Sequence, residues 1–150
     1  MDFKNKNKCH NLFNEIKRLW KDRDILIVEG EQTRLGIGND LFNNVSSIKR
    51  IIAPAIGAFE KYDDILNAVL TIHRNELVLI ALGPTATVLA ADLSEKNVQA
   101  LDIGHIDIEY EWFLNKAKNK RKYTNELIDG RTFTECNDER YTREIVAKLI

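Results

Sequence analysis

A short acidic stretch, residues 102–112, carries the side chains of this sequence that are best suited to chemistry. Its carboxylates and one histidine are interspersed with isoleucines and end beside aromatic residues, in the order Asp102, His105, Asp107, Glu109 and Glu111. Burying carboxylates among apolar side chains costs free energy unless a cation compensates their charge. Oxygen-rich ligand sets suit Mg²⁺ or Mn²⁺ better than zinc. The stretch therefore predicts a metal-assisted site.

The spacing of these acids indicates how a metal would be held. In an extended conformation alternate residues share a face, so Asp107, Glu109 and Glu111 would project together. An Asp-x-Glu pair can then bind one cation and neutralise the phosphates of a leaving nucleotide. His105 has the same parity and could orient a ligand, although a lone histidine is more often a hydrogen-bonded core residue. The alternative for the acids is a solvated strand edge, which their apolar neighbours disfavour.

A glycine-containing loop after residues 24–29 is a second candidate. The Arg34 guanidinium suits phosphate, and glycines permit close backbone approach or a positive φ. The candidate binding residues of this loop are Arg34, Gly36, Gly38, Asn39 and Asp40. An ordinary turn, with Asp40 capping a following helix, explains the same residues about equally well.

A third candidate is the turn that follows the most apolar strand. A Gly-Pro turn opening a helix would place backbone N–H groups and the positive end of the helix dipole at the sheet edge. The residues predicted to contact phosphate or ribose there are Gly83, Pro84, Thr85 and Thr87. Proline at the first helical position beside threonine is also an ordinary helix start.

The elements that must position these loops alternate between strand and helix. Apolar, β-branched runs predict strands over residues 24–29, 48–53, 77–82 and 98–103. Helical periodicity predicts helices over residues 10–22, 58–72, 84–94 and 141–150, with a short helix from Asp40. The apolar faces predicted to pack include Leu12 and Leu19 in the first helix, Phe59 in the second, and Ile145, Val146 and Leu149 in the last. This alternation implies right-handed crossovers, so we predict an α/β fold with a parallel sheet covered by helices on both faces. Ligands of such sheets bind beyond the carboxyl ends of the strands.

Composition narrows the class of protein. A chain of 150 residues with 44% hydrophobic residues fits one domain, and its net charge of −1 gives no electrostatic case for nucleic acid binding. Cys9 and Cys136 have no zinc-site spacing and suggest no disulfide framework. Because the sequence shows neither a signal peptide nor a membrane span, we predict a cytoplasmic protein. The basic run 116–122 is predicted to be a solvated helix face, with phosphate recruitment or contact with anionic lipid as the alternative.

Several motifs, in order, resemble those of the bacterial GT-D-type glycosyltransferases, formerly a domain of unknown function. The motifs are Glu29-Gly-Glu, Arg34-Leu-Gly-Ile-Gly-Asn-Asp40, Ile52-Ala-Pro54, Ala58-Phe59-x-x-Tyr62, Gly83-Pro-Thr-Ala-Thr87, residues 102–112 and Lys122-Tyr123-x-Asn125-Glu126. The match extends from about residue 20 to the C-terminus.

The resemblance implies a Rossmann-like fold and transfer of a sugar from a UDP-sugar donor to a glycan, on a glycoprotein or a surface polysaccharide. It also implies Mn²⁺ or Mg²⁺ held by an Asp-x-Glu motif, which falls here on Asp107 and Glu109. The candidates for activating the acceptor hydroxyl, among which the sequence does not choose, are Glu29, Glu31, His105 and Glu111.

Members of the family are longer and carry an N-terminal Arg-x-Gly-Asp-Gly-Glu motif that this sequence lacks. We therefore expect residues 1–150 to form one GT-D-type domain that corresponds to the C-terminal part of the family's full domain, with residues 1–20 as a leader helix. A separate N-terminal half or another glycosyltransferase is an expected partner.

Two other functions compete with an active glycosyltransferase. The first is a truncated, non-catalytic module that binds a nucleotide sugar or a partner protein. The second is a dinucleotide-dependent oxidoreductase, which is disfavoured because no Gly-x-Gly-x-x-Gly motif follows the first strand.

Overall fold

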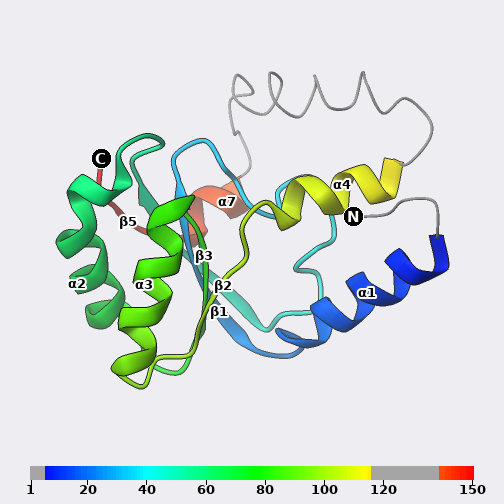
Figure 1. Ribbon diagram of the computed structural model, residues 1–150, viewed down its shortest axis with the longest axis horizontal. Coiled ribbons are helices and arrows are strands. Elements are labelled where there is room, and N and C mark those ends of the chain that lie inside the picture. Colours follow the sequence, from blue (N-terminus) through cyan, green and yellow to red (C-terminus); the bar gives the residue numbers. More distant parts are fainter. Residues whose placement is uncertain (1–5, 116–138) are drawn as a thin grey trace.

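The computed structural model describes residues 6–115 and 139–150 (Figure 1). Within these residues one five-stranded sheet has the order β4-β3-β1-β2-β5, and every pair of neighbours is parallel. The strands are β1 Asp24–Gly30, β2 Ser47–Ala53, β3 Leu77–Ala81, β4 Ala100–Asp102 and β5 Ile145–Lys148. The predicted parallel α/β architecture is confirmed.

Helices cover the sheet on both faces (Figure 1). The helices are α1 Lys6–Arg18, the 3₁₀-helix η1 Ala58–Lys61, α2 Tyr62–Ile72, α3 Pro84–Glu95, α4 Ile106–Asn115 and α7 Glu139–Glu144. Helices α2 and α3 pack on one face, where Ile65 and Leu89 join the core cluster of that side. Helices α1 and α4 lie over the other face, where Phe13 and Tyr110 join a second cluster.

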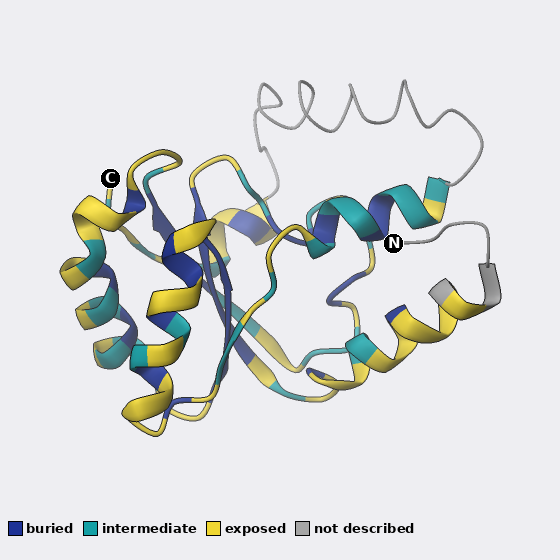
Figure 2. Ribbon diagram, viewed as in Figure 1, coloured by how far each residue is buried: buried dark blue, intermediate teal, exposed yellow. Residues whose placement is uncertain are grey.

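Strand β1 shows why the sequence pattern is an unbroken apolar run. Leu26 and Val28 belong to the cluster under α2 and α3, whereas Ile25 and Ile27 belong to the cluster under α1. All four side chains are fully buried, and the central strands are dark blue in Figure 2 while the outer helix faces are largely exposed. A sheet buried on both faces requires apolar residues at every position of its central strands.

The segment between β1 and β2 is irregular, and the helix predicted from Asp40 is absent. Residues 31–44 form turns, in which Gly36 and Gly38 have φ of 77° and 85°. The Asn39 side-chain oxygen accepts a hydrogen bond from the backbone N–H of Leu41 at 3.0 Å, which favours a turn over a helix. Trp20 fixes the segment from the sheet side, because its buried indole N–H donates to the Leu41 carbonyl at 3.1 Å.

The predicted C-terminal helix over residues 141–150 is wrong. Helix α7 ends at Glu144, and β5 then pairs with β2. The predicted helical stripe of Ile145, Val146 and Leu149 therefore does not form. β-Branched residues suit a pleated surface, and the edge of β2 offered backbone partners that a helix would have left unpaired.

Smaller differences concern the faces of two helices. Leu12 and Leu19, expected on the buried face of the first helix, are 46% and 52% exposed, and Phe59 is 61% exposed. The basic run 116–122, the motif at 122–126 and Cys136 lie outside the described residues. In the part of the chain that the structure describes, no helix has both the length and the apolar character to cross a membrane.

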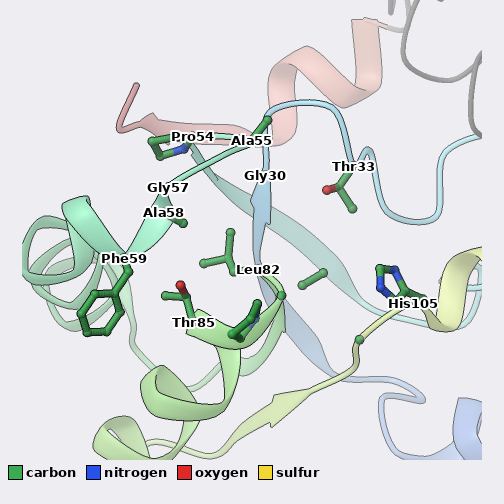
Figure 3. Close-up of a pocket in the computed structure, with 14 residues that line it drawn as sticks. Gly30, Thr33, Pro54, Ala55, Gly57, Ala58, Phe59, Leu82, Thr85 and His105 are labelled. Carbon is green, nitrogen blue, oxygen red and sulfur yellow. The ribbon is translucent and has the colours of Figure 1, made fainter.

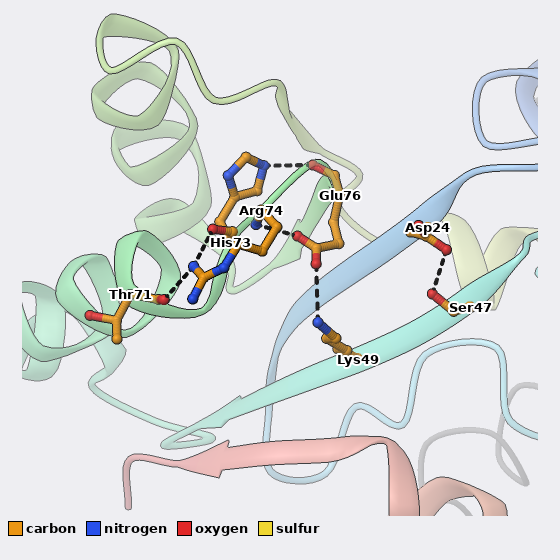
Figure 4. Close-up of polar contacts among 7 residues, drawn as sticks. All are labelled: Asp24, Ser47, Lys49, Thr71, His73, Arg74 and Glu76. Carbon is orange, nitrogen blue, oxygen red and sulfur yellow. Dashed lines mark hydrogen bonds and ion pairs between the residues drawn. The ribbon is translucent and has the colours of Figure 1, made fainter.

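A buried carboxylate braces the amino-terminal end of the sheet (Figure 4). Glu76 is 5% exposed and accepts hydrogen bonds from the Arg74 backbone N–H at 2.7 Å and from Lys49 Nζ at 3.2 Å. Burial alone would raise the pKa of Glu76, but these hydrogen bonds outweigh it and lower the pKa below its ordinary value of 4.5. Glu76 therefore stabilises the fold in its charged form.

Replacing Glu76 by glutamine is expected to lower the free energy of unfolding at pH 7 by about 1 kcal/mol, because charge-assisted hydrogen bonds are weakened. A depressed folded-state pKa contributes stability that is present above the unfolded-state pKa and is lost as the pH falls through the folded-state pKa. The difference between wild type and Glu76→Gln should therefore shrink as the pH falls below 4.5. Urea denaturation at pH 7 and at acid pH measures it, with the exposed Glu95→Gln as control. A pH-independent difference would contradict the assignment.

Candidate functional site

A pocket of about 550 Å³ opens at the carboxyl ends of the strands, and we call it the crevice (Figure 3). Its lining residues lie at or just beyond the ends of β1, β2, β3 and β4: Gly30, Thr33, Pro54, Ala55, Gly57, Ala58, Phe59, Ala81, Leu82, Gly83, Pro84, Thr85, Gly104 and His105. This is the place where parallel α/β sheets bind ligands, and its size is typical of a small-molecule site.

The start of helix α3 forms one wall of the crevice. Gly83 has φ 56° and ψ −139°, a conformation that essentially only glycine adopts. Pro84 occupies the first turn, and no side chain caps the helix. The N-terminal end of a 12-residue helix therefore borders the crevice, with a positive dipole suited to an anion. Thr87 lies outside the lining, and its hydroxyl donates to Asp102 at 2.9 Å.

Helix α4 overturns the expected arrangement of the acids. Residues 106–115 are helical, so Asp107 and Glu111 share a face, while Glu109 points about 200° away from Asp107. The three carboxylates therefore do not project together. The described residues do not fit a cation clamped between Asp107 and Glu109, and they contain no group of three or more His, Cys, Asp or Glu that could hold a metal.

Asp107 and Glu111 instead bind the loop that follows β1, through Asn39. Asp107 is 3% exposed, and its Oδ1 accepts hydrogen bonds from the Gly36 N–H at 3.0 Å and from Asn39 Nδ2 at 2.8 Å. Asn39 Nδ2 also donates to Glu111 Oε1 at 2.9 Å. We call Gly36, Asn39, Asp107 and Glu111 the Asn39 clamp. It ties the loop to the helix whose first residue directly follows His105.

Tyr110 and Asp40 extend this attachment. The Tyr110 hydroxyl donates to Asp40 Oδ1 at 2.6 Å. Burial and the Asp40 carboxylate both raise the pKa of Tyr110, so the phenol keeps its proton as a donor. Lys17 Nζ lies 4.0 Å from Asp40 Oδ2 and links α1 to the same loop.

Glu29 is part of a second buried network. It is fully buried, its Oε1 accepts from Arg50 Nη1 at 2.9 Å, and its Oε2 accepts from the Leu35 N–H at 2.7 Å. Burial raises the pKa of Glu29, and the Arg50 charge opposes that rise. Arg50 Nε also donates to Glu144 at 3.0 Å, which joins β1 and β2 to α7. Both carboxylate oxygens of Glu29 therefore accept hydrogen bonds that hold the fold together.

The sequence-predicted site residues thus divide into two groups. Four of them line the crevice: Gly83, Pro84, Thr85 and His105. The others lie outside its lining: Glu29, Glu31, Arg34, Gly36, Gly38, Asn39, Asp40, Thr87, Asp107, Glu109 and Glu111. Of the candidates for activating an acceptor hydroxyl, His105 alone borders the crevice. Positive φ at Gly36 and Gly38 is confirmed, and Arg34 shares it at 47°.

Several crevice residues were not predicted as site residues: Gly30, Phe59 and Gly104, although each stands in a family motif, and Thr33, which stands in none. Their common signal is position, since Gly30 ends β1 and the other three follow a strand at the carboxyl edge of the sheet. Figure 3 shows Phe59 and His105 on opposite sides of the opening. The polar side chains of the lining are Thr33, Thr85 and His105, so most of the wall is backbone and small apolar groups.

Gly36→Ala is expected to destabilise the protein by at least about 2 kcal/mol, because positive φ and a steric clash act together. A Cβ at Gly36 would lie 2.4 Å from Phe42 Cδ2, whereas a Cβ at Gly38 would meet nothing within 4 Å. Gly38→Ala is therefore the matched control, with a cost of about 1 kcal/mol from backbone strain alone. Thermal unfolding of both variants measures the difference. Equal losses would show that Phe42 does not constrain the loop.

Comparison with known proteins bears on this arrangement. A family model described as "Glycosyltransferase GT-D fold" matches residues 1–129. The chain is 44% identical over 153 residues to the "Probable glycosyl transferase Gly" of Streptococcus gordonii, covering 99% of this chain and 22% of that protein. It is 40% identical over 154 residues to "Glycosyltransferase GlyD" of Streptococcus pneumoniae serotype 4, covering 100% of this chain and 19% of that protein.

Two solved structures are similar over nearly the whole chain. One, described as "The highly conserved domain of unknown function 1792 has a distinct glycosyltransferase fold", has a TM-score of 0.85 and 41% identity. The other, "A New Glycosyltransferase (DUF1792) from Streptococcus sanguinis", has a TM-score of 0.84 and 44% identity. The matches cover 97% and 93% of this chain and 54% of each solved chain. The chain thus spans about half of these structures and about a fifth of the curated relatives.

Proposed function

The chain belongs to the glycosyltransferase GT-D fold family, and we propose that it binds a UDP-sugar in the crevice for transfer of the sugar to a hydroxyl of a glycan. The observation that carries this proposal is the crevice, which sits at the carboxyl ends of parallel strands beside the N-terminal end of α3. The relatives named glycosyltransferases support the reaction class. The acceptor class, a glycoprotein or a surface polysaccharide, and a cytoplasmic location stay predictions of the sequence.

The α3 end of the crevice suits the diphosphate of the donor. Backbone N–H groups at a helix start and the helix dipole stabilise negative charge, which grows on the diphosphate as the sugar leaves. The bare Gly83 lets an anion approach the backbone, since a Cβ there would extend into space with no atom within 4 Å. The Thr85 hydroxyl, in the first turn, supplies a further donor.

His105 is the residue suited to hold or accept the proton of the acceptor hydroxyl. It lines the crevice, and its imidazole is the side chain most often used for such proton transfer. The Glu109 N–H donates to the His105 carbonyl at 3.1 Å, so the histidine is joined to the first turn of α4. The Asn39 clamp then fixes α4, and thereby His105, relative to the β1 loop.

We propose that a divalent cation, Mn²⁺ or Mg²⁺, arrives with the diphosphate rather than occupying a preformed protein site. Such cations are commonly held by one or two carboxylates together with substrate phosphates. Because Oδ1 of Asp107 is engaged in the Asn39 clamp, Glu109 is the carboxylate of the Asp-x-Glu pair that would add a protein ligand to a cation held by the substrate phosphates. The cation would neutralise charge on the diphosphate.

A second candidate function is a non-catalytic module that binds the nucleotide sugar while the rest of the reaction lies elsewhere. The observation that favours it is the lining of the crevice, in which the described residues include no carboxylate. In that case a separate half or another glycosyltransferase is the expected partner. Donor binding without hydrolysis or transfer distinguishes this module from an enzyme.

Titration of the chain with UDP, followed by calorimetry, tests the crevice. UDP is expected to bind, and Thr85→Val should weaken binding about five- to tenfold through loss of one hydrogen bond to a charged group. Thr71→Val is the matched control, because Thr71 lies on α2 away from the crevice and its hydroxyl donates to the Asn67 carbonyl. The proposal fails if UDP does not bind, or if both variants bind it like the wild type.

The role of the cation is tested by repeating the UDP titration with and without Mn²⁺. We expect Mn²⁺ to strengthen UDP binding at least tenfold and Glu109→Gln to abolish that gain. Asp107→Asn should instead lower the melting temperature, because it weakens the hydrogen bonds from Gly36 and Asn39. Equal loss of the Mn²⁺ effect in both variants would restore the Asp-x-Glu clamp, and no Mn²⁺ effect in wild type would remove the cation from the proposal.

A further inference from the structure

A second cavity, of about 410 Å³, lies between the β1–β2 segment, the start of β2 and helix α7. It shares no lining residue with the crevice. Gly36 to Asp40 form one side of it, and Arg50 and Glu144 lie in another part of its wall. The Arg34 to Asp40 motif contributes Gly36, Asn39 and Asp40 to its wall, but the proposed donor site does not use this cavity.

The charges around the second cavity balance. The basic side chains in its wall are Arg50 and Arg140, and the acidic ones are Asp40 and Glu144. Arg50 is already paired, with Glu29 at 2.9 Å and with Glu144 at 3.0 Å. Binding a phosphate or a carboxylate there would face two fixed carboxylates, and binding a cation would face two fixed guanidinium groups. The electrostatics therefore favour a neutral ligand.

The remaining wall groups suit a ligand with many hydroxyls. The Asn39 amide is used by the Asn39 clamp, and the hydroxyls of Ser46 and Ser47 donate to the Asp22 carbonyl and to Asp24. The two serine oxygens can still accept hydrogen bonds from ligand hydroxyls. Phe42 and Ile37 supply apolar surface for the C–H groups of a sugar ring. Asn43 is exposed, and its side chain makes no hydrogen bond among the described residues, so its amide is available to a ligand.

The two cavities are close because one loop lines both. Gly30 and Thr33 border the crevice, and Gly36 borders the second cavity. Three residues of chain span at most about 11 Å, since an extended residue adds about 3.3–3.6 Å. The parts of the two walls that Thr33 and Gly36 form therefore lie within about 11 Å of each other.

We propose that the second cavity is a subsite for a neutral sugar unit of the acceptor glycan, one that does not itself react. The inference rests on the proposed function, because the crevice supplies the donor to which this glycan would be joined. The Asn43 amide hydrogen-bonds the sugar hydroxyls, and the Phe42 side packs against the ring.

The test uses the full chain labelled with ¹⁵N and titrated with neutral trisaccharides of glucose, galactose or N-acetylglucosamine, each followed by NMR. At least one is expected to shift the amide signals of Ile37, Asn39 and Asn43. Asn43→Ala should weaken its binding about fivefold, the usual effect of one lost hydrogen bond. Asn67→Ala, an exposed asparagine on α2, is the matched control and should bind like the wild type. Glucuronic acid and inorganic phosphate are the anionic probes and should bind more weakly.

The subsite is overturned if no trisaccharide shifts these signals at millimolar concentration, if Asn43→Ala binds as tightly as Asn67→Ala, or if the anionic probes bind best. UDP titration of the same sample separates this failure from that of the donor site. UDP binding without sugar binding rejects the subsite alone, whereas sugar binding without UDP binding supports the subsite and rejects the proposed donor crevice.

Discussion

Two adjacent backbone N–H groups, of Leu35 and Gly36, set the constraint on which the rest of the structure depends. Both residues are buried in a loop without regular structure, so neither N–H has a partner from a helix or a sheet. The Leu35 N–H donates to Glu29 and the Gly36 N–H donates to Asp107, at 2.7 Å and 3.0 Å. The loop is thus held between two buried carboxylates.

Each of these buried carboxylates requires a partner that offsets the cost of burying its charge. Glu29 is paired with the buried Arg50, and the second nitrogen of that guanidinium binds Glu144. Glu144 is the last residue of α7 and directly precedes β5, so this ion pair anchors the strand that completes the sheet. Asp107 accepts a hydrogen bond from the Asn39 amide. The same amide donates to Glu111 and so attaches a second turn of α4 to the loop. One loop conformation therefore accounts for both the sheet edge and the orientation of α4.

The sequence was sufficient to predict those strands and helices whose position a single physical rule decides. Continuous apolar runs specified the central strands, and the Gly83-Pro84 turn specified the start of α3 at the crevice. Prediction from the sequence failed where contacts between residues far apart in the chain decide the local structure. Isoleucine and valine at 145–146 fit a helical stripe or a strand, and the free edge of β2 selected the strand. The acids at 107, 109 and 111 fit either an extended strand that binds a metal or a helix with Asp107 and Glu111 on one face. The structure has the helix, and Asn39 donates to both acids of that face. Thr33 lines the crevice because neighbouring strands end together there, which no local motif encodes.

The division of the acids between structure and chemistry limits what the crevice can do by itself. Glu29, Asp107 and Glu111 are each committed to hydrogen bonds within the fold, and the described residues that line the crevice include no carboxylate. Recognition there depends on backbone groups, a helix end and hydroxyls, which favour a negatively charged ligand and would not repel its phosphates. A carboxylate-lined pocket would repel a diphosphate in the absence of a metal, whereas this one does not. In the proposed function, donor binding and proton transfer are therefore separable steps: the first would use the α3 wall, and the second would use His105.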